Sequence, residues 1–230
     1  MNLSVDIGNT AVKWAAFEGR TLVEQGYGLP TEMLSAADRV LACASGAVEG
    51  DANGLPLLTA ATPLPIKLDY KTPATLGADR VAAACGAWGL HPGEASVVID
   101  AGTCITVDFV SDDGVYHGGA IMPGLGMCLN ALHEKTARLP LVSLDGVERA
   151  PVLGRSTEES ILAGTLGATM LALAGYVALY REKCPKLNVL LAGGDASRLA
   201  AAGATGWEME PLLTLRGLNE IMIMEGDKGR

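Results

Sequence analysis

Short runs of apolar residues, separated by turn-forming residues, fill the first 27 positions of the chain. Leu3–Val5, Ala11–Phe17 and Thr21–Tyr27 each have the length and composition of a β-strand. The segments between them, Asp6–Thr10 and Glu18–Gly19, are rich in residues that favour turns. Because short turns join neighbouring strands of opposite direction, this pattern predicts a three-stranded antiparallel meander.

The same order of strands and turns returns in the middle of the chain. The three predicted strands are Ser96–Ile99, Cys104–Val110 and Val115–Met122. The turn Asp100–Thr103 has the pattern Asp-x-Gly-Thr, and Asp6–Thr10 has the similar pattern Asp-x-Gly-Asn-Thr. This weak internal repeat predicts two similar halves, residues 1–92 and 93–230, with a boundary at the turn-forming sequence His-Pro-Gly.

The strand after the second of these turns alternates with a period of two, which is typical of a strand. Its two faces are Ile105, Val107 and Phe109 on one side and Thr106 and Asp108 on the other. Asp112–Gly114 then gives a hairpin signal before the third strand.

The remaining periodic segments indicate helices between the strands. Helices are predicted over Thr31–Ser45, Ala78–Leu90, Leu125–Lys135, Thr157–Lys183 and Ala196–Ala202, and further strands over Leu57–Ala60 and Leu187–Ala192. Thr31 is placed to cap the first helix. The mixture of helices with antiparallel strands at the start of each half predicts the α/β class.

Composition and charge exclude several classes of protein. Hydrophobic residues make up 49% and charged residues 19% of the 230 positions, which excludes intrinsic disorder. Aromatic residues make up only 4%, and the formal net charge is −9, so a nucleic-acid partner is not expected. An anionic substrate would need local donors or a metal ion to overcome this field.

The five cysteines include no Cys-x-x-Cys pair, and the N-terminus shows no secretory signal. Reduced thiols and a cytoplasmic location are therefore expected. Ile161–Tyr180 is uncharged and long enough to cross a bilayer, but half of it is Gly, Ala or Thr. A helix buried on most sides is the favoured interpretation. Its small residues would let another helix approach, from a domain of the same chain or from a second subunit.

The first turn is a candidate phosphate site. Gly8 lets the backbone approach an anion, successive N–H groups can form a cradle, and Asn9, Thr10 and Lys13 add donors. Asp6 at the strand end can hold Mg²⁺ through water. An ordinary hairpin would use the same residue types. Neither a Walker A sequence nor a Gly-x-Gly-x-x-Gly segment after the first strand is present, so both standard nucleotide motifs are excluded.

Two further motifs carry charged residues at element ends. Asp100–Thr103 repeats the acidic turn in the second half, where it could face the first turn across a cleft. Asp79 and Arg80 open a predicted helix, where a carboxylate commonly serves the helix dipole. In a catalytic interpretation, Asp79 accepts a proton from a substrate hydroxyl and Arg80 clamps a carboxylate with two hydrogen bonds.

Taken together, these motifs resemble those of type III pantothenate kinases. The motifs are Asp6-x-Gly8-Asn9-Thr10, Tyr70-x6-Gly77-x-Asp79-Arg80, Asp100-x-Gly102-Thr103 and Gly118-Gly119-Ala120-Ile121-x-Pro123-Gly124. Their order, with the weaker match at Gly193-Gly194, spans most of the chain. The resemblance implies the acetate kinase, sugar kinase, Hsp70 and actin superfamily. Its fold has two ribonuclease-H-like (actin-like ATPase) halves with an ATP cleft between them.

The resemblance also implies a role for each matched residue. ATP would be bound by Asp6, Ile7, Gly8, Asn9, Thr10, Ala11, Val12, Lys13 and Thr103. Pantothenate would contact Tyr70, Gly77, Ala78, Asp79, Arg80 and Thr157, with Asp79 as the catalytic proton acceptor. Asp100 would bind a monovalent cation, potassium or ammonium, and Mg²⁺ would accompany ATP.

The implied activity is the phosphorylation of pantothenate to 4′-phosphopantothenate, the first step of coenzyme A biosynthesis. Thr157 matches a position that touches pantothenate from the partner subunit, which implies a homodimer. Cys104 stands where alanine is usual, a small change. Two alternatives remain: another small-molecule kinase of the superfamily, or a non-catalytic regulator. The presence of Asp6, Asp79 and Asp100 argues against the regulator, because it would have no need of all three.

Overall fold

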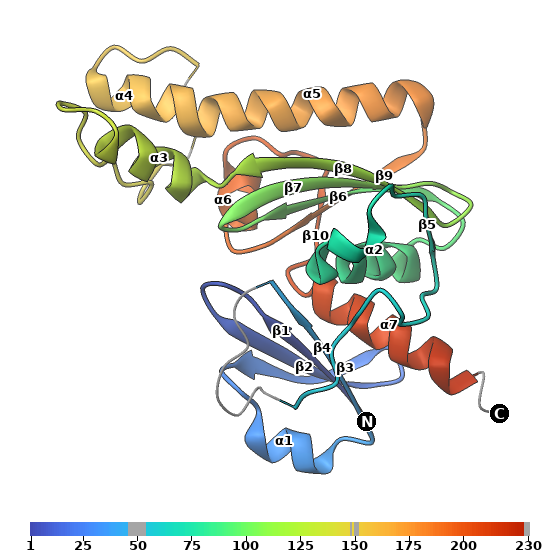
Figure 1. Ribbon diagram of the computed structural model, residues 1–230. Coiled ribbons are helices and arrows are strands. Elements are labelled where there is room, and N and C mark those ends of the chain that lie inside the picture. The colour runs from blue at the N-terminus through green and yellow to red at the C-terminus, as the bar shows by residue number, and fades with distance from the viewer. Residues whose placement is uncertain (46–53, 148, 150–151, 228–230) are drawn as a thin grey trace. The chain divides into compact units, whose positions relative to one another are not determined.

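The computed structural model describes residues 1–45, 54–147, 149 and 152–227 (Figure 1). Contacts group the chain into two compact units. Unit 1 comprises Met1–Ser96, Asp108–Gly118 and Leu212–Arg230, and unit 2 comprises Val97–Val107 and Gly119–Pro211. Unit 1 therefore contains the end of the chain as well as its beginning. The division into halves 1–92 and 93–230 stays a prediction.

The sheet of unit 1 confirms the first predicted meander. β1 (Asn2–Ile7) pairs antiparallel with β2 (Val12–Glu18), and β2 pairs antiparallel with β3 (Thr21–Tyr27). β4 (Arg39–Ala44) adds a parallel strand on the other side of β1, so the strand order is β3-β2-β1-β4. This pairing brings the end of β1 between two neighbours, where it can position a functional side chain.

The helix predicted over Thr31–Ser45 is wrong in its second half. α1 covers only Thr31–Ala36, and Arg39–Ala44 forms β4. Thr31 is also not the cap, because the N-cap residue is Pro30 and no side chain caps this helix. The five apolar residues after Arg39 suit a buried strand as well as a helix, and here the pairing with β1 decides the outcome.

The segment between β4 and the next helix has little regular structure where it is described. Leu57–Ala60 is not a strand, since Leu57 forms only an isolated bridge to Ala42. The short strand β5 (Lys67–Leu68) and the 3-10 helix η2 (Pro73–Thr75) follow. This segment leads into the helix that carries the candidate catalytic residue.

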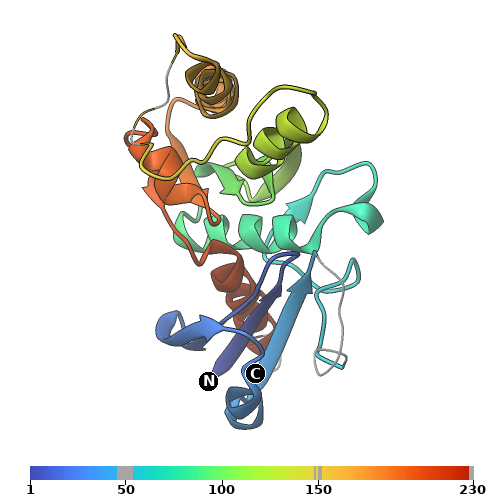
Figure 2. The same ribbon diagram turned by 90° about the vertical axis from the view of Figure 1, so that its left-hand side faces the viewer.

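Two helices of unit 1 pack closely against each other (Figures 1 and 2). α2 spans Ala78–Leu90, as predicted, and α7 spans Leu213–Asp227. A methyl group on Gly217 would lie 1.6 Å from the carbonyl oxygen of Ala82. Only glycine therefore allows this close approach. α7 also contacts β1, β2 and β4, so the end of the chain holds α2 on the first sheet.

A second sheet has six strands in the order β10-β9-β6-β7-β8-β5. One edge strand is β5, described above. The other five strands are β6 (Ala95–Ala101), β7 (Cys104–Val110), β8 (Val115–Pro123), β9 (Leu187–Ala192) and β10 (Glu208–Met209). β6, β7 and β8 are consecutive in the chain and adjacent in the sheet, with tight turns between them. The second predicted meander is therefore confirmed, as are the bounds predicted for β7 and β9.

Unit 2 contains most of the remaining helices. They are α3 (Leu125–Glu134), α4 (Thr157–Leu162), the π-helical segment η3 (Ala163–Gly167), α5 (Ala168–Lys183) and α6 (Ala196–Ala201). α4, η3 and α5 follow one another without interruption, which confirms the long helix predicted over Thr157–Lys183 (Figure 1).

The long helix buries one side and exposes the other. Thr169, Leu173 and Val177 are buried, whereas Leu171 and Leu179 on α5 are 64% and 60% exposed. Burial on most sides was expected, but in the structure it occurs on one side. Among the described helices this is the one long and apolar enough to cross a membrane by length and composition. That is a weak indication, because core helices also meet the criterion.

Candidate active site

The end of β1 places the Asp6 carboxylate between two strands. Asp6 lies opposite Lys13 on β2 and Cys43 on β4, and the Cys43 thiol donates a hydrogen bond to Asp6 Oδ1 over 3.4 Å. Burial raises the pKa of Asp6; the Cys43 bond and the Lys13 charge oppose this rise, and the charge of Asp79 adds to it. Asp6 and Asp79 therefore lie close enough to interact, and a cation between them would be favoured.

The turn that follows Asp6 is open to solvent. The N–H of Gly8 donates to the carbonyl oxygen of Ala11 over 3.1 Å and closes the turn. Asn9, Thr10 and Ala11 are exposed, whereas Ile7 is buried. The turn can thus present backbone and short polar groups to an anion.

Asp79 lies in the first turn of α2, directly after the N-cap residue Gly77 and the first helical residue Ala78. Its Oδ1 accepts a hydrogen bond from the backbone N–H of Arg80 over 2.9 Å. A Cβ on Gly77 would lie 2.5 Å from the same Oδ1. The glycine therefore leaves the space that the carboxylate occupies.

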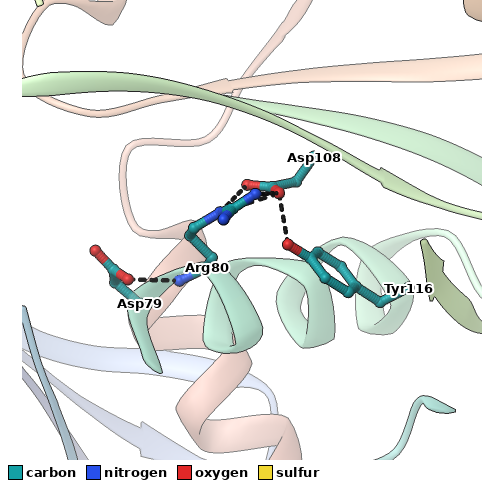
Figure 3. Close-up of polar contacts among 4 residues, drawn as sticks. All are labelled: Asp79, Arg80, Asp108 and Tyr116. Atoms are coloured by element: carbon teal, nitrogen blue, oxygen red, sulfur yellow. Dashed lines mark hydrogen bonds and ion pairs between the residues drawn. The ribbon is translucent and has the colours of Figure 1, made fainter. Parts of the chain in front are cut away.

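Arg80 is buried and already paired with a carboxylate of the protein (Figure 3). Its Nε lies 3.1 and 3.2 Å from the two carboxylate oxygens of Asp108 on β7, and its Nη2 lies 2.5 Å from Oδ1. Burial would lower the pKa of Arg80, but the hydrogen bonds and charge of Asp108 outweigh it and raise the pKa. Arg80 thus clamps a carboxylate with two donor groups, but this carboxylate is Asp108 of the protein; a role toward a substrate carboxylate stays a prediction.

Tyr70 is held near this ion pair. Its hydroxyl oxygen accepts a hydrogen bond from the Arg80 side chain, and its ring centroid lies 6.0 Å from that of Tyr116. A Cβ on Gly118 would lie 3.1 Å from the Tyr70 ring, so the first glycine of the fourth motif leaves room for the ring. The structure thus brings Tyr70 and Arg80 together, and their contact with a substrate stays a prediction.

The second acidic turn is held by backbone contacts within unit 2. A Cβ on Gly193, which has a φ of +91°, would lie 2.5 Å from Asp100 Oδ1 and 2.3 Å from the carbonyl oxygen of Ala101. A Cβ on Gly124 would lie 2.4 Å from the carbonyl oxygen of Thr103. Glycines of two other motifs therefore pack directly on the turn between β6 and β7.

Thr157 lies in a separate place, at the start of α4. The N-cap residue Ser156 accepts a hydrogen bond from the N–H of Glu159 over 3.1 Å, and Glu159 in turn accepts from the N–H of Arg155. A cavity of about 790 Å³ opens here. It is lined by Leu132, Leu139, Gly154, Arg155, Ser156, Thr157, Ser160, Ile161 and Gly164.

Three residues of the site were not expected from the sequence: Cys43, Asp108 and Tyr116. The alternation of the strand puts Asp108 on the face opposite to Ile105 and Val107. In the structure all three residues are buried. An acidic residue in the middle of an apolar strand was the available signal. Among the described residues, no three His, Cys, Asp or Glu side chains form a metal cluster.

Solved structures with the same fold define the class of protein. One is the activator of 2-hydroxyisocaproyl-CoA dehydratase from Clostridium difficile with bound ADPNP, with TM-score 0.57, 16% identity and coverage of 99% of this chain and 96% of that one. For a ROK family protein from Streptococcus pneumoniae TIGR4 in complex with sucrose, the TM-score is 0.54 and the identity 13%, with 99% of each chain covered. For a conserved protein of the Baf transcriptional activator family from Campylobacter jejuni, the TM-score is 0.63 and the identity 21%. The match covers 98% of this chain and 99% of that one. The fold is that of actin-like ATPases and sugar kinases.

Sequence comparison identifies the family within this class. The sequence model of type III pantothenate kinase matches residues 50–179. A type III pantothenate kinase from Bacteroides fragilis is 40% identical, over 96% of this chain and 97% of the relative. A type III pantothenate kinase from Cytophaga hutchinsonii is 36% identical, over 96% of this chain and 98% of the relative. This chain therefore belongs to the type III pantothenate kinase family, and the resemblance seen in the motifs is confirmed.

Proposed function

We propose that this chain transfers the γ-phosphoryl group of ATP to the hydroxyl of pantothenate and produces 4′-phosphopantothenate. This is the first step of coenzyme A biosynthesis. Family membership supports the substrate, and one structural observation supports the chemistry. The half-buried Asp79 carboxylate lies in the first turn of α2, close enough to the half-buried Asp6 to add to the rise in pKa that burial causes there. A base beside a cation and phosphate site is what phosphoryl transfer to an alcohol requires.

Asp79 is the general base in this proposal. Its Oδ1 is oriented by the N–H of Arg80, and Gly77 leaves the space for it. The carboxylate accepts the proton of the pantothenate hydroxyl as the new O–P bond forms and the bond to ADP breaks. Tyr70, Ala78 and Arg80 belong to the same region and complete the proposed substrate side.

The turn from Asp6 to Lys13 is the proposed phosphate site. Its exposed residues can reach ATP, while Asp6, which burial and the charge of Asp79 make costly to ionise, gains from a nearby cation. Mg²⁺ fits here through water, and when bound it neutralises charge on the transferring phosphoryl group. Thr103 is proposed as an additional ATP contact.

Asp100 is proposed to hold a monovalent cation, potassium or ammonium. The carboxylate lies at the end of β6, against the backbone of Gly193, so it is fixed in position. A fixed carboxylate beside turn carbonyl groups provides the oxygen ligands that such a cation needs.

A homodimer is proposed to complete the site. The exposed face of α4, η3 and α5 carries Leu171, Leu179 and small residues, and the cavity at Thr157 lies at its beginning. A second copy of the chain is the proposed occupant of this face, which would let one subunit lend Thr157 to the other. The five cysteines are free thiols, which supports the proposed cytoplasmic location.

The dimer has a direct test in the mass of the protein in solution. Light scattering should give twice the chain mass of 23.7 kDa. Leu171→Glu should give a monomer without activity, because a charge would be buried in the interface. Val23→Glu is the control, since Val23 on β3 is also an exposed apolar residue, at 52%. Full activity of a proven monomer would contradict the dimer.

The product of the reaction tests the function itself. The purified protein is incubated with ATP and Mg²⁺ in potassium buffer, with pantothenate, acetate or a hexose as acceptor, and the products are identified by mass spectrometry. We expect a phosphorylated product from pantothenate alone. Phosphorylation of a sugar or of acetate instead would indicate another kinase of the superfamily. No product from any acceptor, with folded and dimeric protein, would favour a regulator.

A further inference from the structure

Arg80 is an unusual residue for its place in α2. The seven positions that follow it in the helix, Val81–Ala87, are buried and apolar or small, and Arg80 is buried with them. A buried guanidinium requires a partner, because removing its charge from water is costly. Asp108 is that partner: the side chains of Arg80 and Asp108 are only 8% and 2% exposed.

The geometry of this pair uses one whole edge of the guanidinium. Nε and Nη2 of Arg80 both donate to the Asp108 carboxylate, which is the side-on arrangement of a two-pronged ion pair. A substrate carboxylate therefore cannot use the same edge. The Nε and Nη2 groups of Arg80 thus form an ion pair within the protein.

Asp108 is held in turn by β8. The fully buried Tyr116 hydroxyl donates to Asp108 Oδ1 over 2.7 Å, so this carboxylate accepts hydrogen bonds from three donor groups of two residues. Burial, followed by the charge of Asp108, raises the pKa of Tyr116, which keeps the hydroxyl protonated as a donor. The network thus joins the first turn of α2 to β7 and β8 through fixed side chains (Figure 3).

The proposed base is attached to this network at one atom. Asp79 precedes Arg80, and its Oδ1 accepts the Arg80 N–H over 2.9 Å. Figure 3 shows Arg80 with its backbone N–H toward Asp79 and its guanidinium toward Asp108. Arg80 therefore connects the two carboxylates: its side chain is anchored on Asp108, and its backbone N–H orients the carboxylate of Asp79.

We propose that Asp108 and Tyr116 are positioning residues for phosphoryl transfer. They fix Arg80 and so hold the first turn of α2 where Asp79 can receive the proton of the acceptor hydroxyl. This inference rests on the proposed function of Asp79 as base. Neither residue is proposed to touch a substrate.

The test uses the full-length protein and three variants. Tyr116→Phe removes one hydroxyl and keeps the ring; Asp108→Asn keeps the shape and removes the charge. Tyr27→Phe is the matched control, because Tyr27 on β3 is 79% exposed. The measurements are kcat and the KM values for pantothenate and ATP, with rates divided by the fraction of protein that binds ATP, and the unfolding midpoint.

Tyr116→Phe should lower kcat by about 10-fold and Asp108→Asn by up to roughly 10²-fold, with the KM for ATP unchanged, because a displaced base loses its alignment. Tyr27→Phe should match the wild type. If Asp108→Asn does not fold, the kcat of Tyr116→Phe alone tests the positioning role. A folded Tyr116→Phe with wild-type kcat overturns the positioning role while the wild type still phosphorylates pantothenate. An inactive wild type would instead reject the proposed function.

Discussion

The two acidic turns have nearly the same sequence and different surroundings. After Asp6, the first turn exposes Asn9, Thr10 and Ala11, and the half-buried Asp6 carboxylate lies beside a thiol. In the second turn, the backbones of Gly124 and Gly193 pack directly against the turn, although Thr103 itself is exposed. An open turn can adapt to a large anion with several phosphates, whereas a tightly packed turn can only offer a fixed set of oxygens. Similar motifs thus suit phosphate binding in one unit and cation binding in the other.

The largest expected effect concerns the residue that interacts with the first turn. If the reacting phosphate lies there, Asp79→Asn should lower kcat by roughly 10²–10⁴-fold, the usual contribution of a general base. The fold should remain, because asparagine fits the same space. Steady-state ADP release measures the change, with Asp112→Asn, on an exposed hairpin, as the control. Near-normal turnover in Asp79→Asn would remove this residue from the role of base.

A pair of glycine variants tests the packing difference between the turns. Gly193→Ala should destabilise the protein by about 1–3 kcal/mol, because alanine at a φ of +91° is strained and its Cβ would contact Ala101. Gly8→Ala should cost less, because Gly8 has no positive φ and its Cβ would make one tight contact, at 3.1 Å from the Ala11 carbonyl oxygen. Urea unfolding compares the two. Equal losses of stability would mean that the turns are packed alike.

A cation at the second turn should make the enzyme sensitive to the monovalent salt. Wild-type turnover is expected to be higher in potassium than in sodium buffer at equal ionic strength. Asp100→Asn should remove that difference and leave a low rate in both buffers, because the fixed carboxylate is lost. A variant that is still activated by potassium would place the cation elsewhere.

The smallest effect concerns Asp6, the half-buried carboxylate of the first turn. Burial raises the pKa of Asp6 above its ordinary value of 3.8, so the folded state favours the neutral form. The free enzyme therefore loses stability as the pH rises from about 4 through this raised pKa. Asp6→Asn should have a higher Tm than the wild type at pH 7 and an equal Tm below pH 4.

Addition of ATP and Mg²⁺ should reverse the order of the two proteins at pH 7, because only the carboxylate gains from the cation. Thermal unfolding with and without the ligand measures this reversal. A Tm gain that is equal in the wild type and in Asp6→Asn would show that Asp6 does not interact with Mg²⁺.

The sequence predicted the bounds of a helix or strand well where its apolar residues recur with the period of that element. β7, β9 and α2 have the predicted bounds, and the motifs at Asp6 and Asp79 were found in the sequence and are brought close together. α7 was missed, although Leu215, Leu218 and Met222 have helical spacing and are buried. Its sequence mixes polar and apolar residues, and its burial depends on distant α2.

Long-range pairing explains the other differences. Arg39–Ala44 became a strand because β1 lies beside it, and nothing in the local sequence reveals that partner. Asp108 likewise looked like an outward residue of an alternating strand, until its pairing with Arg80 from another element placed it in the interior. Residues whose role depends on a contact across the fold are those that a single sequence predicts least well.

The most direct test of the account is the release of ADP by the purified wild-type protein from ATP and Mg²⁺ in potassium buffer, with and without pantothenate. The account predicts rapid release that depends on pantothenate and yields one phosphorylated pantothenate per ADP. A rate that is unchanged by pantothenate, in protein shown to be folded and dimeric, would contradict it.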